Sequence, residues 1–271
     1  MVPAKIGIFD SGFGGLSVLR AVLHVLRGHP IVYLADQAHV PYGQRSMKEV
    51  QEFSIEITRW LLEQSCEEII VACNTASAAA LHHLRNVYPD VPFVGMEPAI
   101  KPAAEQTKSG VVGVIATPAT FQGAMYTSVV ERFASGVIVL ENTCPGLVEE
   151  IEAGHLDGPE THRILQTALQ PMLEKGIDTI VLGCTHFPFV IPVIQEIAGP
   201  NVRVIDPAPA IARQAARMLK TSTGSVVQNT SVKFYTTGNP TIFFENIQFF
   251  LSTETQIHPM KWDNTGYLQS V

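Results

Sequence analysis

The chain has 271 residues, a formal net charge of −7 and a hydrophobic fraction of 46%. This composition is ordinary for a globular protein, and the length suggests about two domains. The negative charge and the lack of Lys or Arg runs argue against nucleic acid or a membrane surface as a partner. No apolar run approaches the roughly 18 residues that span a bilayer, and the first residues show no secretory signal pattern, so we expect a cytoplasmic protein.

Short apolar segments alternate with amphipathic segments along the chain. We expect strands at residues 6–9, 31–35, 69–72, 91–95, 111–115, 137–140, 180–182, 202–205 and 232–236. We expect helices at residues 16–26, 47–64, 77–86, 147–153, 159–175, 208–219 and 241–251, and one helix that follows residues 117–120 and runs to about 133. Residues 221–231 have the composition of a polar loop, and the tail after residue 252 has no clear pattern. This alternation predicts an α/β fold with mainly parallel sheets covered by helices.

Polar side chains follow most of the predicted strands. These clusters are Asp10-Ser11, Asp36, Cys73-Asn74-Thr75, Thr117, Cys184-Thr185-His186 and Asp206. Ligands of open parallel sheets bind at the carboxyl ends of the strands. We therefore expect the functional site to be built from these clusters.

The sequence contains an internal repeat. Cys73 and Cys184 are 111 positions apart (184 − 73). Two further matches share this offset: Pro89-Asp90-Val91 with Pro200-Asn201-Val202, and Pro98-Ala99-Ile100 with Pro209-Ala210-Ile211. We therefore expect two similar, pseudo-symmetric α/β domains with the active site in the cleft between them. The first comprises residues 1–96 and 208–271 and carries Cys73, and the second comprises residues 97–207 and carries Cys184.

The four cysteines are Cys66, Cys73, Cys144 and Cys184, and none has the C-x-x-C spacing of zinc or redox motifs. Most reduced cysteines are small buried hydrophobic residues, and we assign Cys66 and Cys144 to that structural class. Cys73 and Cys184 differ because each follows a predicted strand and precedes a helix N-terminus. Such a position favours the thiolate, and each of the two has its counterpart in the other half.

Two cysteines that face each other suit few kinds of chemistry. A metal site needs further ligands, and the one evident candidate is His186, which is also a plausible proton partner of Cys184. A Cys–His nucleophile would leave Cys73 without a use. Proton transfer between two bases fits the symmetry best. One thiolate removes a proton from a carbon atom, and the other thiol delivers a proton to the opposite face.

The glycine-rich segment at residues 10–15 follows a strand and opens a helix. This position suits an anion at a helix N-terminus. The segment does not match the dinucleotide-binding pattern, because the third glycine of G-x-G-x-x-G falls on Ser17. A tight turn with Asp10 as a cap explains the glycines equally well.

Five segments, taken in order, resemble the cofactor-independent aspartate/glutamate racemase family. They are residues 6–16, residues 33–36 with 41–43, and residues 72–77, 113–117 and 182–186. The resemblance implies interconversion of L- and D-glutamate without pyridoxal phosphate, any other cofactor or a metal. It also implies a supply of D-glutamate for peptidoglycan, and assembly as a homodimer.

The resemblance also implies roles for individual residues. Cys73 and Cys184 would be the two acid/bases, assisted by Asp10, Glu152 and His186. The substrate would be held by Asp10, Ser11, Pro41, Tyr42, Gly43, Asn74, Thr75, Thr117, Thr185 and His186. Neutral donors and helix N-termini can hold the carboxylates of glutamate despite the negative charge of the chain.

Three other activities remain open at the level of sequence. A racemase of the same superfamily with a shorter pocket would act on aspartate. A binding protein would capture an acidic amino acid without chemistry. A hydrolase would use Cys184 and His186 alone.

Overall fold

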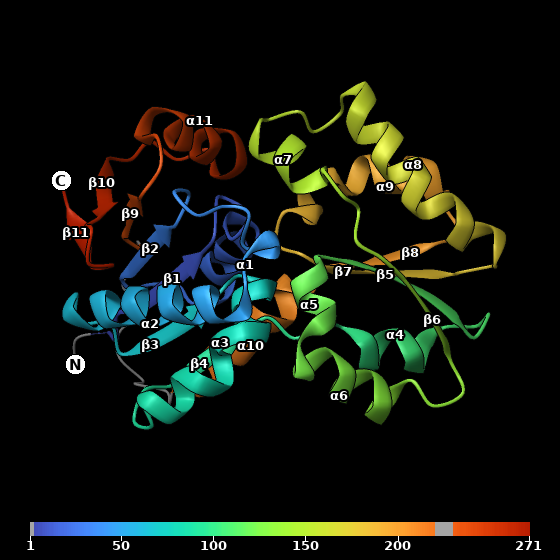
Figure 1. Ribbon diagram of the computed structural model, residues 1–271, viewed down its shortest axis with the longest axis horizontal. Helices are drawn as coiled ribbons and strands as arrows, with labels where there is room; N and C mark the ends of the chain where they lie inside the picture. The colour runs from blue at the N-terminus through green and yellow to red at the C-terminus, as the bar shows by residue number, and fades with distance from the viewer. Residues whose placement is uncertain (1–2, 220–229) are drawn as a thin grey trace. The chain divides into compact units, whose positions relative to one another are not determined.

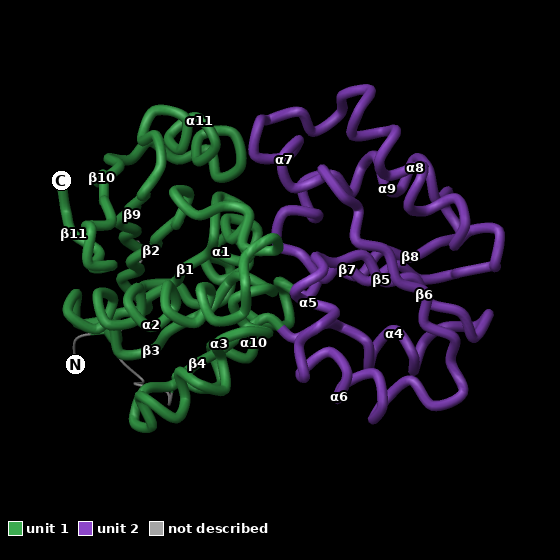
Figure 2. Tube along the Cα trace, viewed as in Figure 1, with its two compact units in different colours: residues 1–96, 208–271 green, residues 97–207 purple. Residues whose placement is uncertain are grey.

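The computed structural model describes residues 3–219 and 230–271. The chain divides into two compact units, residues 1–96 with 208–271 and residues 97–207 (Figure 2). Each unit is built on its own sheet, and helices pack against that sheet. The mixed α/β fold with mainly parallel sheets that the sequence predicts is therefore confirmed. The predicted loop at residues 221–231 lies almost wholly outside the described residues.

The first unit contains a seven-stranded sheet in the order β11-β10-β9-β2-β1-β3-β4. Its strands are β1 (Ile6–Asp10), β2 (Ile31–Ala35), β3 (Glu68–Val71), β4 (Phe93–Gly95), β9 (Val232–Thr236), β10 (Ile257–Trp262) and β11 (Leu268–Ser270). All neighbours pair in parallel except β10 and β11. Every residue of strands β1, β2 and β3 is buried, as expected for parallel strands covered on both faces.

The helices of the first unit come from both ends of the chain. They are α1 (Leu16–Val25), the 3₁₀ helix η1 (Tyr42–Gln44), α2 (Met47–Glu63), α3 (Asn74–Val87), α10 (Ala208–Met218) and α11 (Pro240–Leu251). Helix α2 packs against α3, and α1 packs against α10. A capping box between Ser46 and Glu49 fixes the start of α2. The unit is therefore complete only when residues before 97 and after 207 are both in place.

The second unit contains a parallel four-stranded sheet in the order β6-β5-β7-β8. Its strands are β5 (Val111–Ala116), β6 (Ile138–Asn142), β7 (Thr179–Gly183) and β8 (Arg203–Ile205). Its helices are α4 (Ile100–Gln106), α5 (Pro118–Gln122), α6 (Ala124–Phe133), α7 (Leu147–Glu152), α8 (Pro159–Glu174), η2 (Phe187–Val190) and α9 (Ile191–Ala198). Val112 and Val114 of β5 pack with Ile100 of α4 and Val129 of α6 in one buried cluster.

The two sheets share a strand order. In the first, β1 lies between β2 and β3, with β4 next to β3; in the second, β5 lies between β6 and β7, with β8 next to β7. Cys73 comes after β3 and Cys184 comes directly after β7. The two cysteines therefore occupy corresponding positions, each at the carboxyl end of the same strand of its sheet.

Several helix boundaries differ from the sequence prediction. Helix α3 begins at Asn74 rather than at residue 77, because the sulfur of Cys73 caps it by accepting the N–H of Ala76. The single helix predicted up to residue 133 is two helices, α5 and α6, which meet at Gly123. Helices α4 and α9 were not predicted. Each carries a proline, Pro102 or Pro192, in its first turn, where proline is tolerated.

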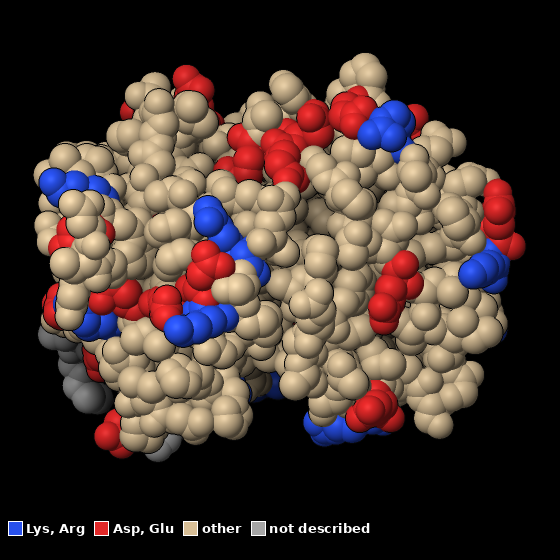
Figure 3. Space-filling model, viewed as in Figure 1, with Lys and Arg blue, Asp and Glu red and all other residues tan. Residues whose placement is uncertain are grey.

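The tail has more structure than its sequence pattern suggests, because residues 257–262 and 268–270 form β10 and β11. Over the described ranges, no helix is long and apolar enough to cross a membrane. On the face shown in Figure 3, Lys and Arg side chains are scattered and form no continuous basic area.

Candidate functional site

In the first unit, the carboxyl ends of β1 and β3 bring Ser11 and Cys73 together. Cys73 is buried, and its Sγ lies 3.7 Å from Ser11 Oγ. The same sulfur accepts the backbone N–H of Ala76 at 3.4 Å, in the first turn of α3. Hydrogen-bond donors at a helix N-terminus are the partners that a thiolate takes. The position of Cys73 therefore suits an acid/base group.

Asn74 and Thr75 follow Cys73 as the first two residues of α3, and both are buried. Neither the Oδ1 nor the Nδ2 atom of Asn74 has a hydrogen-bond partner among the described residues. Buried polar side-chain atoms in folded proteins nearly always have one. The amide of Asn74 is therefore available for a ligand that carries both a donor and an acceptor.

Asp10 ends β1 and is fully buried. Its Oδ2 accepts the N–H of Gly12 at 3.0 Å, which gives the glycine-rich turn the cap that its sequence suggests. Gly15 is required for close approach, because a Cβ there would lie 2.6 Å from the hydroxyl of Tyr33 and 2.7 Å from Asp10 Cβ. The turn is therefore shaped around the carboxylate of Asp10.

Pro41, Tyr42 and Gly43 form the turn that opens η1, here called the Tyr42 turn. The hydroxyl of Tyr42 is buried and donates to Asp36 Oδ2 at 2.7 Å. Burial and the neighbouring Asp36 raise the pKa of Tyr42 well above its usual value, and Cys73 and Asp10 add smaller contributions in the same direction. Tyr42 therefore stays protonated, and its ring lies within electrostatic reach of Asp10 and Cys73.

In the second unit, three predicted residues form a continuous chain of contacts. Cys184 Sγ lies 3.7 Å from His186 Nδ1, and His186 Nε2 lies 2.6 Å from Glu152 Oε1 at the end of α7. His186 is buried, and burial alone would lower the pKa of its imidazole. The hydrogen bonds to Cys184 and Glu152 outweigh burial and raise that pKa well above its usual value. The imidazole of His186 is therefore held in its protonated form beside Cys184.

Thr117 and Thr185 lie at the carboxyl ends of β5 and β7, and both are buried. Thr117 caps α5, where its Oγ1 accepts the N–H of Thr120 at 3.3 Å and lies 3.0 Å from Thr120 Oγ1. Thr185 stands between Cys184 and His186 in the chain. The second unit thus gathers its predicted residues at one end of its sheet.

The other two cysteines are also buried. Burial raises the pKa of the Cys66 thiol to about 12, although Lys5 partly opposes the shift. Burial also raises the pKa of the Cys144 thiol to about 12, with a smaller contribution from Cys184. Both therefore remain neutral thiols at physiological pH. Among the described residues, no group of three or more His, Cys, Asp or Glu side chains is placed to hold a metal ion.

Asp36 is a feature of the site whose partners the sequence analysis missed. Its carboxylate accepts from Tyr42 and also from Thr237 and Trp262, which lie in the C-terminal part of the chain. The sequence placed Asp36 at a strand end but gave no sign of the last two partners, because the tail beyond residue 252 lacks a periodic pattern.

Comparisons with known proteins agree with this fold. The sequence profile described as Asp/Glu/Hydantoin racemase matches residues 6–215. A glutamate racemase of Roseiflexus sp. (strain RS-1) is 51% identical over 215 residues, which cover 79% of each chain. The crystal structure of a glutamate racemase isoform from Bacillus anthracis matches with a TM-score of 0.85 and 32% identity, covering 96% of this chain and 98% of that one. A glutamate racemase from Francisella tularensis subsp. tularensis SCHU S4, solved in complex with D-glutamate, matches with a TM-score of 0.82 and 30% identity over 95% of this chain and 97% of that one.

The fold and the sequence are similar to those of racemases over most of the chain, and racemases are isomerases. The chain belongs to the Asp/Glu/Hydantoin racemase family. The family resemblance and the enzyme class expected from the sequence are therefore confirmed.

Proposed function

We propose that this chain is a glutamate racemase, which interconverts L- and D-glutamate by moving the proton on Cα. The observation that carries the proposal is the corresponding placement of buried Cys73 and Cys184 after β3 and β7. The assignment of glutamate as the substrate rests on the relatives, because proteins that are about half identical to this chain are glutamate racemases.

Racemisation by this route exchanges one proton for another. The thiolate of one cysteine removes the Cα proton, and the electron pair left on Cα is delocalised into the α-carboxylate. The thiol of the other cysteine then donates its proton to the opposite face of Cα, so the two cysteines end with their protonation states exchanged. The reverse reaction uses the same two groups in swapped roles, which is why each unit needs an acid/base.

The two sides differ in their proton partners. On the Cys184 side, the imidazole of His186 lies beside the sulfur and can hold a proton there, and Glu152 holds the imidazole in place. On the Cys73 side, the helix N-terminus and Ser11 contact the sulfur, and Asp10 lies nearby as the proposed carboxylate partner. We therefore propose that different groups assist the two thiols.

Most of the groups that we propose for substrate binding are neutral. The amide of Asn74 has both a donor and an acceptor left over, which match an α-carboxylate and an α-ammonium. The hydroxyls of Ser11, Thr75, Thr117 and Thr185, together with the backbone of the Tyr42 turn, supply further donors for the two carboxylates. Neutral donors hold the carboxylates by hydrogen bonds and add no charge of their own to the site.

We also propose that the product serves peptidoglycan synthesis, that the enzyme works in the cytoplasm, and that it acts as a homodimer. These proposals rest on the family relationship. The proposed reaction moves protons between the two thiols and Cα, and it changes no oxidation state.

The deciding experiment follows the Cα proton in deuterium oxide. We expect ¹H NMR to show loss of the Cα signal of both L- and D-glutamate with the unaltered chain, and circular dichroism to show racemisation. Cys73→Ser and Cys184→Ser should each lower the racemisation rate by at least about a thousandfold, because a hydroxyl is a far weaker acid than a thiol.

Cys66→Ser is the matched control, because it removes a buried thiol that has no proposed role, and racemisation should continue. Full racemisation by either Cys73→Ser or Cys184→Ser would contradict the use of two bases. Faster turnover of aspartate than of glutamate would assign a different substrate. Binding of glutamate without any deuterium exchange would indicate a binding protein.

A further inference from the structure

Asp36 is the centre of a buried hydrogen-bond network that the proposed chemistry does not use. The side chain directly follows β2 and is fully buried. Its Oδ2 accepts from the hydroxyl of Tyr42 at 2.7 Å and from His39 Nδ1 at 2.8 Å. Its Oδ1 accepts from Thr237 Oγ1 at 2.8 Å and from Trp262 Nε1 at 2.7 Å. Each carboxylate oxygen therefore has two donors.

The two oxygens face different parts of the chain. The donors to Oδ2 lie just after β2, in the loop that leads into the Tyr42 turn. The donors to Oδ1 lie about 200 residues later, where Thr237 follows β9 and Trp262 ends β10. Strands β9 and β10 extend the sheet beyond β2, as the orange-red and blue strands of Figure 1 show. Asp36 thus joins the C-terminal strands to the Tyr42 turn.

An aromatic cluster surrounds this network. The ring of His39 stacks on Phe53 with centroids 3.9 Å apart. Trp262 lies edge-on to His39 at 5.1 Å and tilted against Phe53 at 5.7 Å, and Tyr42 also lies 5.7 Å from Phe53. Hydrogen bonds in such apolar surroundings are stronger than in water, and a donor lost there is not readily replaced.

A second set of contacts supports the same loop. The N–H of Ala38 donates to Thr237 Oγ1 at 2.9 Å, and Thr236 Oγ1 donates to Gln37 Oε1 at 2.8 Å. A Cβ at Gly238 would lie 2.6 Å from Gln37 Cβ, so the two backbones approach closely. Residues 36–38 therefore lie directly against residues 236–238.

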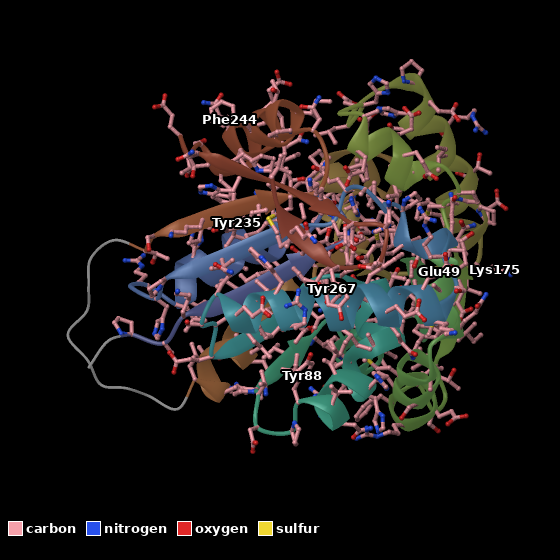
Figure 4. All side chains as sticks on the ribbon, turned by 60° about the vertical axis from the view of Figure 1, so that its left-hand side comes forward. Glu49, Tyr88, Lys175, Tyr235, Phe244 and Tyr267 are labelled. Atoms are coloured by element: carbon pink, nitrogen blue, oxygen red, sulfur yellow. The ribbon has the colours of Figure 1, made fainter. Side chains whose placement is uncertain are left out.

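The hairpin of β10 and β11 has its own attachment to α2. The N–H of Leu268 donates to Glu56 Oε1 at 2.8 Å. The guanidinium of Arg59 lies over the ring of Tyr267, 5.4 Å from its centroid, and Figure 4 labels this tyrosine. These contacts hold the hairpin without touching Asp36, so the two kinds of contact can be tested separately.

We infer that Trp262 and Thr237 are positioning residues for substrate binding, acting through Asp36 on the Tyr42 turn. The two donors on Oδ1 fix the rotation of the carboxylate, and Oδ2 then holds the hydroxyl of Tyr42. The inference rests on the proposed function, in which the Tyr42 turn binds glutamate. Loss of either donor loosens the turn and weakens substrate binding, while the proton-transfer groups stay in place.

The first test separates KM from kcat. Trp262→Phe keeps an aromatic ring but removes the N–H donor, and we expect KM for glutamate to rise about tenfold while kcat changes less than about threefold. Tyr267→Ala is the control, because it weakens the hairpin at a distance from Asp36 and should leave KM within about twofold. An equal rise in KM in both variants, or a fall in kcat at constant KM, would overturn the inference.

Variants of Thr237 test the same link without altering the aromatic cluster. Thr237→Val is nearly isosteric and removes the hydroxyl, so KM should rise as it does for Trp262→Phe. Thr237→Ser keeps the hydroxyl and should restore the low KM. A KM that is high for both Thr237 variants would show that the methyl group matters and would count against the role of Asp36.

A double-mutant cycle tests the route through Tyr42. If Trp262 acts by way of the Tyr42 hydroxyl, Trp262→Phe should change KM less than about twofold in a Tyr42→Phe background. Effects on KM that multiply in the double variant would show that Trp262 acts by another route.

Hydrogen exchange supplies a readout that does not depend on the substrate. The amides of Gln44 and Arg45 are bonded to the Tyr42 turn, and they should exchange about tenfold faster in Trp262→Phe but not in Tyr267→Ala. Unchanged exchange in Trp262→Phe would overturn the link from Trp262 to the turn. If the unaltered chain fails to racemise glutamate, the proposed function falls, and the exchange result by itself still decides whether this link exists.

Discussion

At the scale of single residues, His186 has hydrogen-bond partners of two kinds on its two ring nitrogens. Nδ1 faces the thiol of Cys184, whereas Nε2 lies against the carboxylate of Glu152. A carboxylate on one nitrogen stabilises the imidazolium and fixes the ring plane, as in other carboxylate–histidine pairs. The raised pKa of His186 therefore depends on a residue that lies 34 positions earlier in the chain.

The first prediction concerns this pair. Glu152→Gln removes the charge but keeps the shape, so the pKa of His186 should fall, as measured by NMR titration of the imidazole nitrogens. The same change should lower the free energy of unfolding by about 1–3 kcal/mol at neutral pH. The chain has nine histidines, and the other eight serve as internal controls, since their resonances at each pH should be the same in both proteins.

The sign of the pH dependence follows from the raised pKa. The contribution of the ion pair to stability is fully present below the ordinary histidine pKa of 6.5 and is lost as pH rises through the higher pKa in the folded state. Urea denaturation at several pH values should therefore bring the unaltered chain and Glu152→Gln closer in stability at alkaline pH. A constant difference across the range would contradict this account.

The sequence identified single residues best where their position in the chain was informative. Cys73 and Cys184 were predicted to occupy corresponding positions because each follows an apolar strand and because the repeat relates them, and the structure places them after β3 and β7. Trp262 was not recognised, since its partner Asp36 is 226 positions away and nothing near Trp262 marks a bond to a buried carboxylate. A contact that joins distant segments leaves no local pattern in the sequence.

At the scale of secondary-structure elements, β3 contains a local conflict. Its first residue, Glu68, is fully buried, and neither carboxylate oxygen has a hydrogen-bond partner in the part of the chain that the structure describes. Burial raises the pKa of Glu68 from about 4.5 to about 8. The side chain is therefore neutral in the folded protein at pH 7, and folding requires it to take up a proton.

A second prediction follows for β3. Glu68→Leu should raise the free energy of unfolding by about 1–3 kcal/mol at pH 7, because an unsatisfied polar group is replaced by an apolar one. Urea denaturation measures this change. Glu67→Gln is the control, because the neighbouring side chain is exposed and its replacement should have little effect.

The pH dependence of that gain gives the sharper test. Glu68 costs no ionisation energy below about pH 4.5, where the unfolded chain is also protonated. The cost grows as pH rises from about 4.5 to about 8 and is constant above that. The advantage of Glu68→Leu should therefore be larger at pH 8 than at pH 4, and an advantage that shrinks as pH rises would refute the assignment.

The turn between α4 and β5 depends on one carboxylate from another strand. Asp178, next to β7, accepts from the hydroxyl of Thr107 at 2.7 Å and from the N–H of Ser109 at 2.8 Å. Burial opposes ionisation, but these bonds and that of Lys108 outweigh it and lower the pKa of Asp178 to about 2. Asp178 thus ties the start of β5 to its neighbour β7.

The third prediction concerns this turn. Asp178→Asn should lower the free energy of unfolding by about 1 kcal/mol at pH 7, a modest value because the carboxylate is only partly buried and solvent screens its charge. The contribution of the carboxylate is present above its ordinary pKa of 3.8 and is lost as pH falls towards 2, so the variant and the unaltered chain should converge in acid. Thermal unfolding monitored by circular dichroism at pH 7 and pH 3 measures both effects.

At the scale of the whole molecule, the two units differ in how the chain builds them. Residues 97–207 form the second unit as one continuous segment with its own sheet and buried cluster. The first unit needs residues from both ends of the chain, because β9 pairs with β2 and α10 packs on α1. The repeat in the sequence predicted similar sheets. Of the three strands that extend the first sheet, the sequence predicted β9 at residues 232–236 but not β10 or β11.

A fourth prediction tests this asymmetry. A fragment of residues 97–207 should fold on its own, with a cooperative urea transition and a dispersed amide NMR spectrum. It should show no racemisation, because it holds only one of the two cysteines. Residues 1–96 alone should not unfold cooperatively, since their sheet lacks β9 and α1 lacks α10. Cooperative folding of residues 1–96 together with an unfolded 97–207 fragment would reverse this assignment.

The four-donor network around Asp36 has a consequence for the order in which the protein matures during translation. The ribosome releases β2, Asp36 and the Tyr42 turn early, but Thr237 and Trp262 emerge only after the whole second unit has been made. Until then β2 is an open sheet edge, and a carboxylate that is later buried stays in water. A nascent chain that stops short of Trp262 can thus carry both cysteines while the Tyr42 turn, which we propose binds substrate, still lacks two of the bonds that fix Asp36.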